Sequence, residues 1–441
     1  MNHLEAVRKY KKMYKQLLAT ADELAGRIES NDVLCCDITL AQPGALLNAV
    51  AKHVKEKGLT NVKQHILLDV YPYEMYQDAE LLGKYTGVSW FSSGGARKAV
   101  SNGLADVMPC YYRDIPSLFT QYVDVDYFVA AVSPMDKHGY FSMSTVGSAS
   151  QALLHKAKHI IVEVNKNLPR ALNSPMVHIS QIDGLYENHV PLVCLPKAEI
   201  DETSKTIGGL IAERIPDGAT LQLGIGAVPD AVGLALKHKH DLGIHTEMFT
   251  DSMVELIECG AVNNSKKPIH TGKTVATFAF GSQRIYDLID DNPAFELLPV
   301  DYVNDPAVIA QHPNFVSINA ALEVDFYGQV CAESIGTKHV SGSGGQVDYV
   351  RGATQSPGGM SFIAFPSTAK GGTVSKIMPT LTPGAIVTTS KNDVDYIVTE
   401  FGIAKLRGKP LSERAKALIS IAHPNFRDEL TFAAKKQGIL I

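Results

Sequence analysis

The chain contains the stretch Leu221-Gln-Leu-Gly-Ile-Gly-Ala-Val-Pro-Asp-Ala-Val-Gly-Leu-Ala-Leu236, where a short apolar run, a glycine turn and an amphipathic run follow one another. This order predicts a strand, a tight turn and a helix, with Pro229 suited to the first helical turn. Such a turn directs free backbone N–H groups and the positive end of a helix toward an anion. The alternative interpretation is a glycine turn that only joins the strand tightly to the helix.

The same stretch is similar to a dinucleotide-binding fingerprint, but the match is incomplete. The pattern GxGxxG requires glycine where this chain has Pro229. In addition, no acidic residue closes a following strand in the way that ribose binding requires. A dinucleotide site is therefore disfavoured.

Outward from this stretch, short β-branched runs alternate with longer amphipathic runs, which is typical of α/β proteins. Strands are predicted at residues 33–39, 127–133, 160–165, 220–223, 275–280, 315–318, 361–365 and 396–399. Residues 44–57 repeat apolar positions at intervals of three and four, and Gly58 supplies a helix stop. The predicted fold class is α/β.

The length of the chain indicates two domains. At 441 residues, with 45% hydrophobic and 20% charged residues, the chain exceeds the size at which a single core usually keeps growing. A polar passage at Pro196–Ser204 precedes a new helical pattern at residues 207–215. We therefore predict an N-terminal α/β domain over residues 1–200 and a C-terminal α/β domain over residues 201–441.

Composition restricts the partners of the protein. The formal charge of −5, from 41 basic and 46 acidic residues, argues against a nucleic-acid or anionic-membrane surface. Residues 1–15 form a charged helical pattern without a secretory apolar region, and no run approaches the roughly eighteen apolar residues of a membrane span. The six cysteines are scattered, which suits reduced thiols in the cytoplasm better than a disulfide framework.

Two further segments are rich in small residues. The segment Ser341-Gly-Ser-Gly-Gly-Gln-Val-Asp348 precedes an apparent helix start, and Ser92-Ser-Gly-Gly-Ala-Arg97 has a similar composition. A backbone without side chains lets a ligand lie against the main chain. A mobile surface loop is the alternative for each segment taken alone.

Glu247, in the segment Gly243–Phe249 between the two glycine segments of the second half, is the candidate nucleophile. A carboxylate near bare backbone loops can attack an activated acyl group while loop N–H donors hold the resulting oxyanion. Most glutamates are instead solvated or paired carboxylates. Because the chain lacks a GxSxG elbow, a cysteine motif and a metal spacing such as HExxH, we assign no metal and favour a carboxylate.

The quoted segments resemble the acetyl-CoA hydrolase/transferase family, a group of coenzyme A transferases. The resemblance covers nearly the whole chain. It is carried by residues 105–109, 115–119, 133–140, 164–170, 224–228, 245–248, 342–346, 366–370, 398–402 and 421–427. One departure is Phe401, where tyrosine is common in the family.

The resemblance implies two similar open α/β domains facing each other across a cleft, with coenzyme A bound mostly by the C-terminal one. It implies that Glu247 is the nucleophile and that the Val228 and Gly345 amides form the oxyanion hole. The implied coenzyme contacts are Gly224, Ile225, Gly226, Ala227, Val228, Ser341, Gly345 and Lys370.

The resemblance further implies ping-pong transfer of coenzyme A, through a glutamyl thioester, between an acyl-CoA and a carboxylate. We expect butyryl- or 4-hydroxybutyryl-CoA with acetate, coenzyme A as substrate without a tightly bound cofactor, and a homodimer. The alternatives are an acyl-CoA hydrolase, which differs only in admitting water, and a non-catalytic acyl-CoA-binding protein, which would not need Glu247. A nicotinamide dehydrogenase is a third, weaker alternative.

Overall fold

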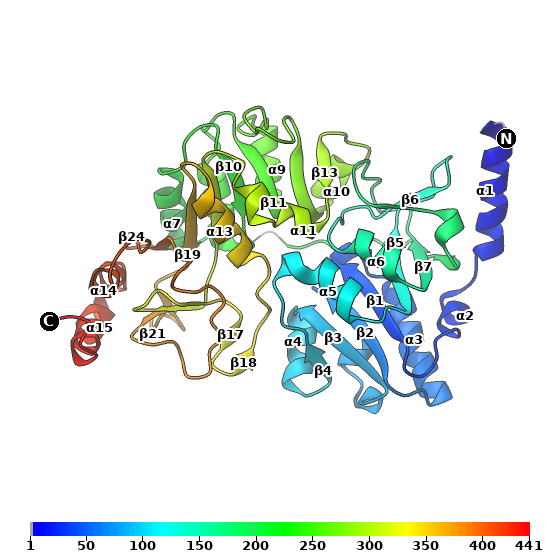
Figure 1. Cartoon of the computed structure of the whole chain (residues 1–441), viewed down its shortest axis with the longest axis horizontal. Coiled ribbons are helices and arrows are strands. Elements are labelled where there is room, and N and C mark those ends of the chain that lie inside the picture. The colour runs from blue at the N-terminus through cyan, green and yellow to red at the C-terminus, as the bar shows by residue number, and fades with distance from the viewer. Residues whose placement is uncertain (1–2, 197) are drawn as a thin grey trace. The chain divides into compact units, whose positions relative to one another are not determined.

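The computed structural model describes residues 3–196 and 198–441 (Figure 1). The chain forms two compact units. One comprises Met1–Leu195 with Ala276–Tyr302, and the other comprises Pro196–Val275 with Val303–Ile441. Met1 and Asn2, at the start of the predicted N-terminal helix, lie outside the described residues. Lys197, in the predicted polar passage, also lies outside them.

The first unit is built on a seven-stranded sheet in the order β4-β3-β2-β1-β5-β7-β9. All of its pairings are parallel. The strands are β1 (Val33–Ile38), β2 (Val62–Leu67), β3 (Tyr85–Phe91), β4 (Ala105–Val107), β5 (Tyr127–Val132), β7 (His159–Val164) and β9 (Gly184–Glu187). Parallel strands need crossover connections, which helices supply here.

The helices of the first unit begin and end where local chemistry directs. They are α1 (His3–Leu17), α2 (Ala21–Ala25), α3 (Gly44–Lys57), α4 (Gly94–Ser101), α5 (Ile115–Tyr122) and α6 (Ser150–Lys156). Helix α3 ends at Gly58, which has the left-handed φ of 65°, as predicted. The Ser92–Arg97 segment is a helix start rather than a loop, because the Ser93 side chain caps α4 by accepting from the Gly95 amide.

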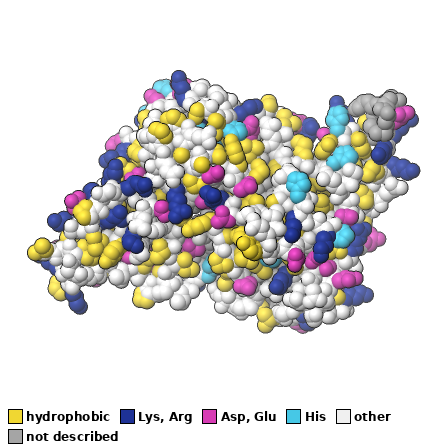
Figure 2. All heavy atoms as spheres, in the orientation of Figure 1, with side chains coloured by type: hydrophobic (Ala, Val, Ile, Leu, Met, Phe, Trp, Pro, Cys, Tyr) yellow, Lys and Arg dark blue, Asp and Glu magenta, His cyan; other side chains and the backbone are white. Residues whose placement is uncertain are grey.

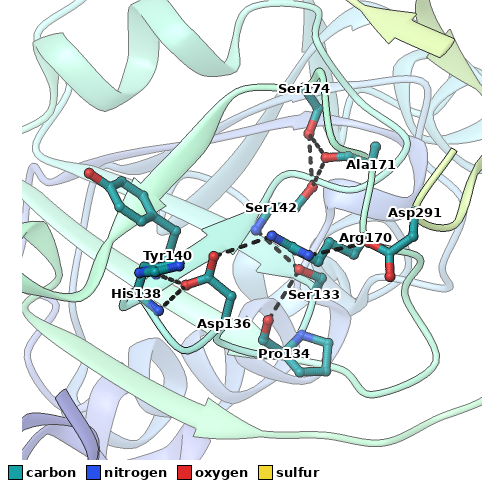
Figure 3. Close-up of polar contacts among 10 residues, drawn as sticks. All are labelled: Ser133, Pro134, Asp136, His138, Tyr140, Ser142, Arg170, Ala171, Ser174 and Asp291. Carbon is teal, nitrogen blue, oxygen red and sulfur yellow. Dashed lines mark hydrogen bonds and ion pairs between the residues drawn. The ribbon is translucent and has the colours of Figure 1, made fainter. Parts of the chain in front are cut away.

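Arg170 ties three segments of the first unit together (Figure 3). Its guanidinium donates to Asp136 Oδ2 and to Asp291 Oδ1, each at 3.3 Å. The other carboxylate oxygen of Asp136 accepts from the amides of His138, at 2.8 Å, and Tyr140, at 2.9 Å. These polar residues of the family-like segments therefore stabilise loops of the unit.

The segment Ala276–Tyr302 belongs to the first unit, although the preceding residues Pro196–Val275 belong to the second. It contributes most of β12 (Thr274–Ala279), α10 (Gln283–Ile289) and β13 (Phe295–Leu297). The amide of Gly147 donates to Thr277 O at 2.7 Å, and the amide of Ala279 donates to Thr145 O at 2.9 Å. Backbone hydrogen bonds thus integrate this distant segment.

In the second unit, six strands follow one another in the order β11-β10-β14-β19-β23-β24. They are β10 (Thr220–Leu223), β11 (Gly243–Phe249), β14 (Phe315–Asn319), β19 (Met360–Ala364), β23 (Tyr396–Thr399) and β24 (Gly402–Lys405). The pairings are parallel except at the edge, where β23 and β24 are antiparallel. The predicted α/β class is confirmed, and each predicted strand is present within about one residue of its expected ends.

The helices of the second unit are α7 (Glu202–Ala212), α8 (Ala227–Ala235), α9 (Asp251–Glu258), α12 (Pro306–Ile309), α13 (Gln346–Gln355), α14 (Leu411–Ser420) and α15 (Pro424–Lys436). Helix α13 packs on β14 and β19. It therefore begins near the carboxyl-terminal ends of these parallel strands, the edge at which open α/β sheets bind ligands.

Side chains of both charge signs are distributed over the face drawn in Figure 2.

All six cysteines are free, and Cys194 and Cys259 are exposed. Within the residues described, no helix combines the length and apolarity needed to cross a bilayer.

Candidate active site

Glu247 lies in the carboxyl-terminal half of β11 and is partly exposed, whereas its neighbours in the strand are buried. Consecutive side chains of a strand point to opposite faces, so His245 and Glu247 share one face. The position near the end of a parallel strand leaves the carboxylate accessible to a ligand at the edge of the sheet.

Two donors meet the Glu247 carboxylate. Asn304, between α11 (Val300–Val303) and α12, donates from Nδ2 to Glu247 Oε2 at 2.8 Å. The backbone N–H of Gly345, the residue before α13, also hydrogen-bonds to the carboxylate. Burial raises the pKa of Glu247 to about 7, and these two hydrogen bonds oppose the rise. Near neutral pH the carboxylate is therefore poised between its two protonation states.

Gly345 must be glycine for this approach. A Cβ at this position would lie 2.0 Å from Glu247 Oε2 and 2.2 Å from Asn304 Nδ2. Any side chain would displace the carboxylate or the amide. The glycine-rich composition of the segment is thus explained by close contact between backbone and carboxylate.

Side chains on both sides fix the glycine-rich segment. Ser343 Oγ donates to Glu333 Oε1 at 3.1 Å, and Thr388 Oγ1 donates to the same oxygen at 2.9 Å. At the first residue of α13, Gln346 Nε2 donates to Ala320 O at 2.8 Å. Because the segment is anchored at both ends, it is not a mobile surface loop.

The other glycine turn joins β10 to α8 as predicted. The Gly224 amide donates to Ile318 O at 2.8 Å, and Gly226 has a φ of 116° that favours glycine. Ile225 is 52% exposed. Ala227 and Val228 begin α8, so their amides belong to the first turn, where N–H groups lack partners within the helix. In the described part of the chain, no hydrogen bond joins Val228 to Glu247.

The remaining predicted site residues are not in hydrogen-bond contact with Glu247 within the described ranges. Ser341 is half-buried, and its amide donates to Glu333 O at 3.3 Å. Lys370 is exposed on the turn between β20 (Thr368–Ala369) and β21 (Val374–Ser375). The structure thus brings together Glu247 and Gly345, whereas Val228, Ser341 and Lys370 form no hydrogen bond with the carboxylate in the described part of the chain.

Sequence reasoning missed Asn304. The side chain is buried, and its amide is the only side-chain donor to Glu247 among the described residues. Its sequence context, Asn304-Asp305-Pro306, is typical of a turn and carries no catalytic signal. Only the fold reveals the role, because the contact spans 57 residues of sequence.

A second polar contact joins residues 366–370 to residues 398–402, two of the segments that carry the family resemblance. The Ser367 amide donates to Glu400 Oε2 at 2.8 Å, and the Ser367 hydroxyl donates to Glu400 Oε1. Nearby, Lys376 donates to Ala321 O at 3.0 Å, and burial lowers the pKa of this ammonium group to about 8. Two segments far apart in sequence are thus held together beside a partly desolvated cation.

The second unit is an open, mostly parallel α/β sheet with a desolvated carboxylate near the end of a strand, and sequence comparison defines the family. Residues 1–195 match the acetyl-CoA hydrolase/transferase N-terminal domain, and residues 281–434 match the C-terminal domain of the same family. The chain belongs to the acetyl-CoA hydrolase/transferase family.

Similar proteins support the class of activity. The succinyl-CoA:cyclohexane-1-carboxylate CoA transferase of Geobacter metallireducens is 47% identical, over 98% of each chain. The 4-hydroxybutyrate coenzyme A transferase of Clostridium kluyveri is 44% identical, over 97% of this chain and 99% of that one. The crystal structure of RipA from Yersinia pestis superposes with a TM-score of 0.93 at 39% identity, covering 98% of this chain and 99% of that one. The chain is an enzyme of the CoA-transferase class.

Proposed function

We propose that the enzyme transfers coenzyme A from an acyl-CoA to a carboxylate by way of a thioester on Glu247. The observation that carries this proposal is the partly exposed Glu247 carboxylate, desolvated and met by the Asn304 amide and the Gly345 N–H. Both donors are uncharged. They can therefore hydrogen-bond to Glu247 as a carboxylate and also after it has become a neutral acyl group.

In the proposed reaction, a Glu247 oxygen attacks the thioester carbon, and the coenzyme A thiolate leaves. The product is a mixed anhydride. The thiolate then attacks the Glu247 carbonyl carbon, the C–O bond to the acyl group breaks, and the first carboxylate departs. A second carboxylate reverses these steps, so that the kinetics are ping-pong and atoms and charge balance throughout.

The two donors at Glu247 suit the step in which the thiolate attacks. At that point the tetrahedral centre is the Glu247 carbon itself, and its oxyanion is the former carboxylate oxygen. Asn304 Nδ2 already lies 2.8 Å from Oε2, and the Gly345 N–H bonds to the same carboxylate. We assign the Val228 amide to the other oxyanion, which forms on the acyl carbonyl of the substrate.

Coenzyme A is the substrate, and we propose no tightly bound cofactor. We assign coenzyme contacts to Gly224, Ile225, Gly226, Ala227 and Val228, together with Ser341, Gly345 and Lys370. The α8 N-terminus suits an anionic phosphate, and Lys370 suits a phosphate as a point charge. We propose a short-chain acyl group, butyryl or 4-hydroxybutyryl, with acetate as acceptor. The Clostridium relative carries 4-hydroxybutyrate in its name, and the Geobacter relative carries succinyl-CoA and cyclohexane-1-carboxylate.

Covalent labelling tests the proposal. Incubation with butyryl-CoA without an acceptor should leave a coenzyme A adduct on the peptide that contains Glu247, detectable by intact mass and removable by borohydride. Glu247→Gln should abolish the adduct. A matched control is Glu323→Gln, because Glu323 is a buried carboxylate that accepts two hydrogen bonds from Thr382. Equal labelling of wild type and Glu247→Gln would refute the assignment.

Acceptor dependence separates a transferase from a hydrolase. A transferase should consume butyryl-CoA at its full rate only when acetate is added at millimolar concentration. Release of thiol at the same rate without acetate would favour the hydrolase, in which water reaches the anhydride or the thioester. Panels of short and cyclic carboxylates then identify the acceptor.

A further inference from the structure

The Asn304 side chain has a second partner that determines its orientation. Tyr349, on α13, donates its hydroxyl to Asn304 Oδ1 at 3.1 Å. The opposite end of the same amide, Nδ2, donates to Glu247 Oε2. An asparagine amide has one acceptor and one donor end, so a donor on Oδ1 leaves Nδ2 directed at the carboxylate.

The backbone beside Asn304 is held as well. His245 Nε2 lies 2.7 Å from Val303 O. A carbonyl oxygen only accepts, so Nε2 carries the proton and donates. Burial lowers the pKa of His245 well below its usual value, with His312 and Lys267 acting in the same direction. His245 therefore remains a neutral donor, and the residue preceding Asn304 is fixed from the strand that carries Glu247.

We infer that Tyr349 is a positioning residue for the Glu247 reaction, acting through the Asn304 amide. This inference rests on the proposed function of Glu247. Tyr349 is buried and its ring stacks on Phe315 with centroids 6.1 Å apart, so the hydroxyl is fixed by packing. A fixed donor in turn selects one of the two orientations of the amide.

The need for Tyr349 arises when Glu247 loses its charge. An ionised carboxylate by itself attracts the amide N–H₂ end of Asn304. Once Glu247 is a thioester or an anhydride, its oxygen is a neutral and weaker acceptor. The Tyr349 hydroxyl then keeps Nδ2 in place for the next oxyanion, and an amide turned the other way would present its own oxygen to that oxyanion.

The pKa of the Glu247 carboxyl is set by burial and by uncharged donors. No charged side chain of the described residues is among the causes of the Glu247 pKa shift, and the titratable groups linked to it through Asn304 and its neighbour Val303 are Tyr349 from α13 and His245 from β11. His245 stays neutral, and the groups that act on it are His312, Lys267 and His270. The pKa of Glu247 is raised by burial and lowered by Asn304 and Gly345. A change in the orientation of Asn304 should therefore be visible in the pH profile.

Tyr349→Phe tests the inference, because it removes only the hydroxyl and keeps the ring. We expect kcat to fall about tenfold, less than the roughly 10²-fold or greater loss expected when an oxyanion donor is deleted, with KM for butyryl-CoA little changed. The acid limb of the pH profile should move to higher pH, because without the Tyr349 hydroxyl the Asn304 amide can turn and accept from the protonated Glu247, which stabilises the protonated form. The matched control is Tyr286→Phe, which removes another buried hydroxyl that donates to a backbone carbonyl, at 2.8 Å from Val193 O.

A double-mutant cycle shows whether Tyr349 acts through Asn304. In an Asn304→Ala background, Tyr349→Phe should cause no further loss of kcat. Equal fold losses in the two backgrounds would overturn the inference. If Tyr349→Phe does not fold, Asn304→Asp gives an independent test, since Tyr349 can still donate to one oxygen while the other oxygen replaces Nδ2 beside Glu247. An unchanged kcat and an unchanged acid limb in Asn304→Asp would also overturn it.

The covalent adduct separates this inference from the proposed function. If wild type forms no adduct on Glu247, the proposed function fails, whatever Tyr349 does. If wild type and Tyr349→Phe both form the adduct, at equal rates and with the same pH dependence, only the positioning role fails. Slower formation in Tyr349→Phe, with full stoichiometry on the same peptide, is the expected result.

Discussion

At the scale of single residues, the protonation state of Glu247 governs its reactivity. Burial raises the pKa of this carboxyl from 4.5 to about 7, and only the ionised form is nucleophilic. We predict that kcat/KM for acyl-CoA rises with pH and reaches half its plateau near pH 7. Initial rates measured across the neutral range check this. A midpoint near 4.5, the ordinary value, would show that the nucleophile is a solvated carboxylate.

The same raised pKa has a cost in stability. The folded state binds the Glu247 proton more tightly than the unfolded chain does, so the free energy of unfolding falls as pH rises from 4.5 to about 7 and the penalty stays constant above that. Glu247→Gln should remove this penalty and stabilise the protein by on the order of 1 to 3 kcal/mol above neutral pH. Urea unfolding of both proteins at acidic and at alkaline pH measures the difference. A stabilisation that does not depend on pH would contradict this origin.

At the scale of elements, the start of α13 controls the site. Gly345→Ala places a methyl group 2.0 Å from Glu247 Oε2, so the loop or the carboxylate must move. We predict a loss of kcat of about 100-fold or more, with a smaller change in KM. The matched control is Gly209→Ala in α7, where an added Cβ meets no atom within 4 Å. Steady-state kinetics with circular dichroism distinguish local displacement from unfolding, and an active Gly345→Ala would show that the close approach is dispensable.

The loops of the first unit depend on Asp136. Asp136→Ala removes the acceptor for the His138 and Tyr140 amides and the partner of Arg170. We predict a loss of about 1 to 3 kcal/mol in the free energy of unfolding. Asp136→Asn keeps one oxygen to accept from the two amides and loses both the charge and the oxygen that accepts from Arg170, and it should cost less than about 1 kcal/mol because the ion pair is partly exposed. Denaturant titration compares the two variants. If both lose the same stability, the interaction with Arg170, and not the acceptor for the two amides, is the main contributor.

Much of the fold could be predicted because its signals are local. The turn after β10 and the Gly58 stop of α3 depend on neighbouring residues only, and both are present. The family resemblance implied Glu247 as the nucleophile and the Gly345 amide as an oxyanion donor, and these roles stay predictions, although the structure brings the two groups together. Asn304 and Tyr349 could not be predicted, because side-chain contacts across a fold leave no periodic pattern in the sequence.

At the scale of the whole molecule, the first unit includes a segment that is distant in sequence from the rest of the unit. The predicted boundary near residue 200 remains a prediction. The segment Ala276–Tyr302 groups with the first unit, through bonds such as the Leu297 amide to Asn173 O at 2.9 Å. The boundary was predicted from a polar passage near residue 200. A local signal of this kind does not predict that a later segment packs with the first unit, because such pairing depends on residues far apart in sequence.

We predict that residues 1–200 expressed alone unfold at a lower urea concentration than the same unit in the intact chain. The backbone partners of Thr145 and Gly147, Ala279 and Thr277, would be missing. The single tryptophan, Trp90, lies in β3, so its fluorescence reports the first unit in both proteins. Equal midpoints would show that the returning segment adds no stability.

The exposed thiols of Cys194 and Cys259 have a practical consequence for assays. Released coenzyme A is conveniently followed with colorimetric disulfide reagents, which react with any accessible sulfhydryl. These two thiols therefore contribute up to two equivalents of background colour per chain before turnover begins. Replacing both residues with serine would give a preparation in which a single-turnover burst can be quantified directly.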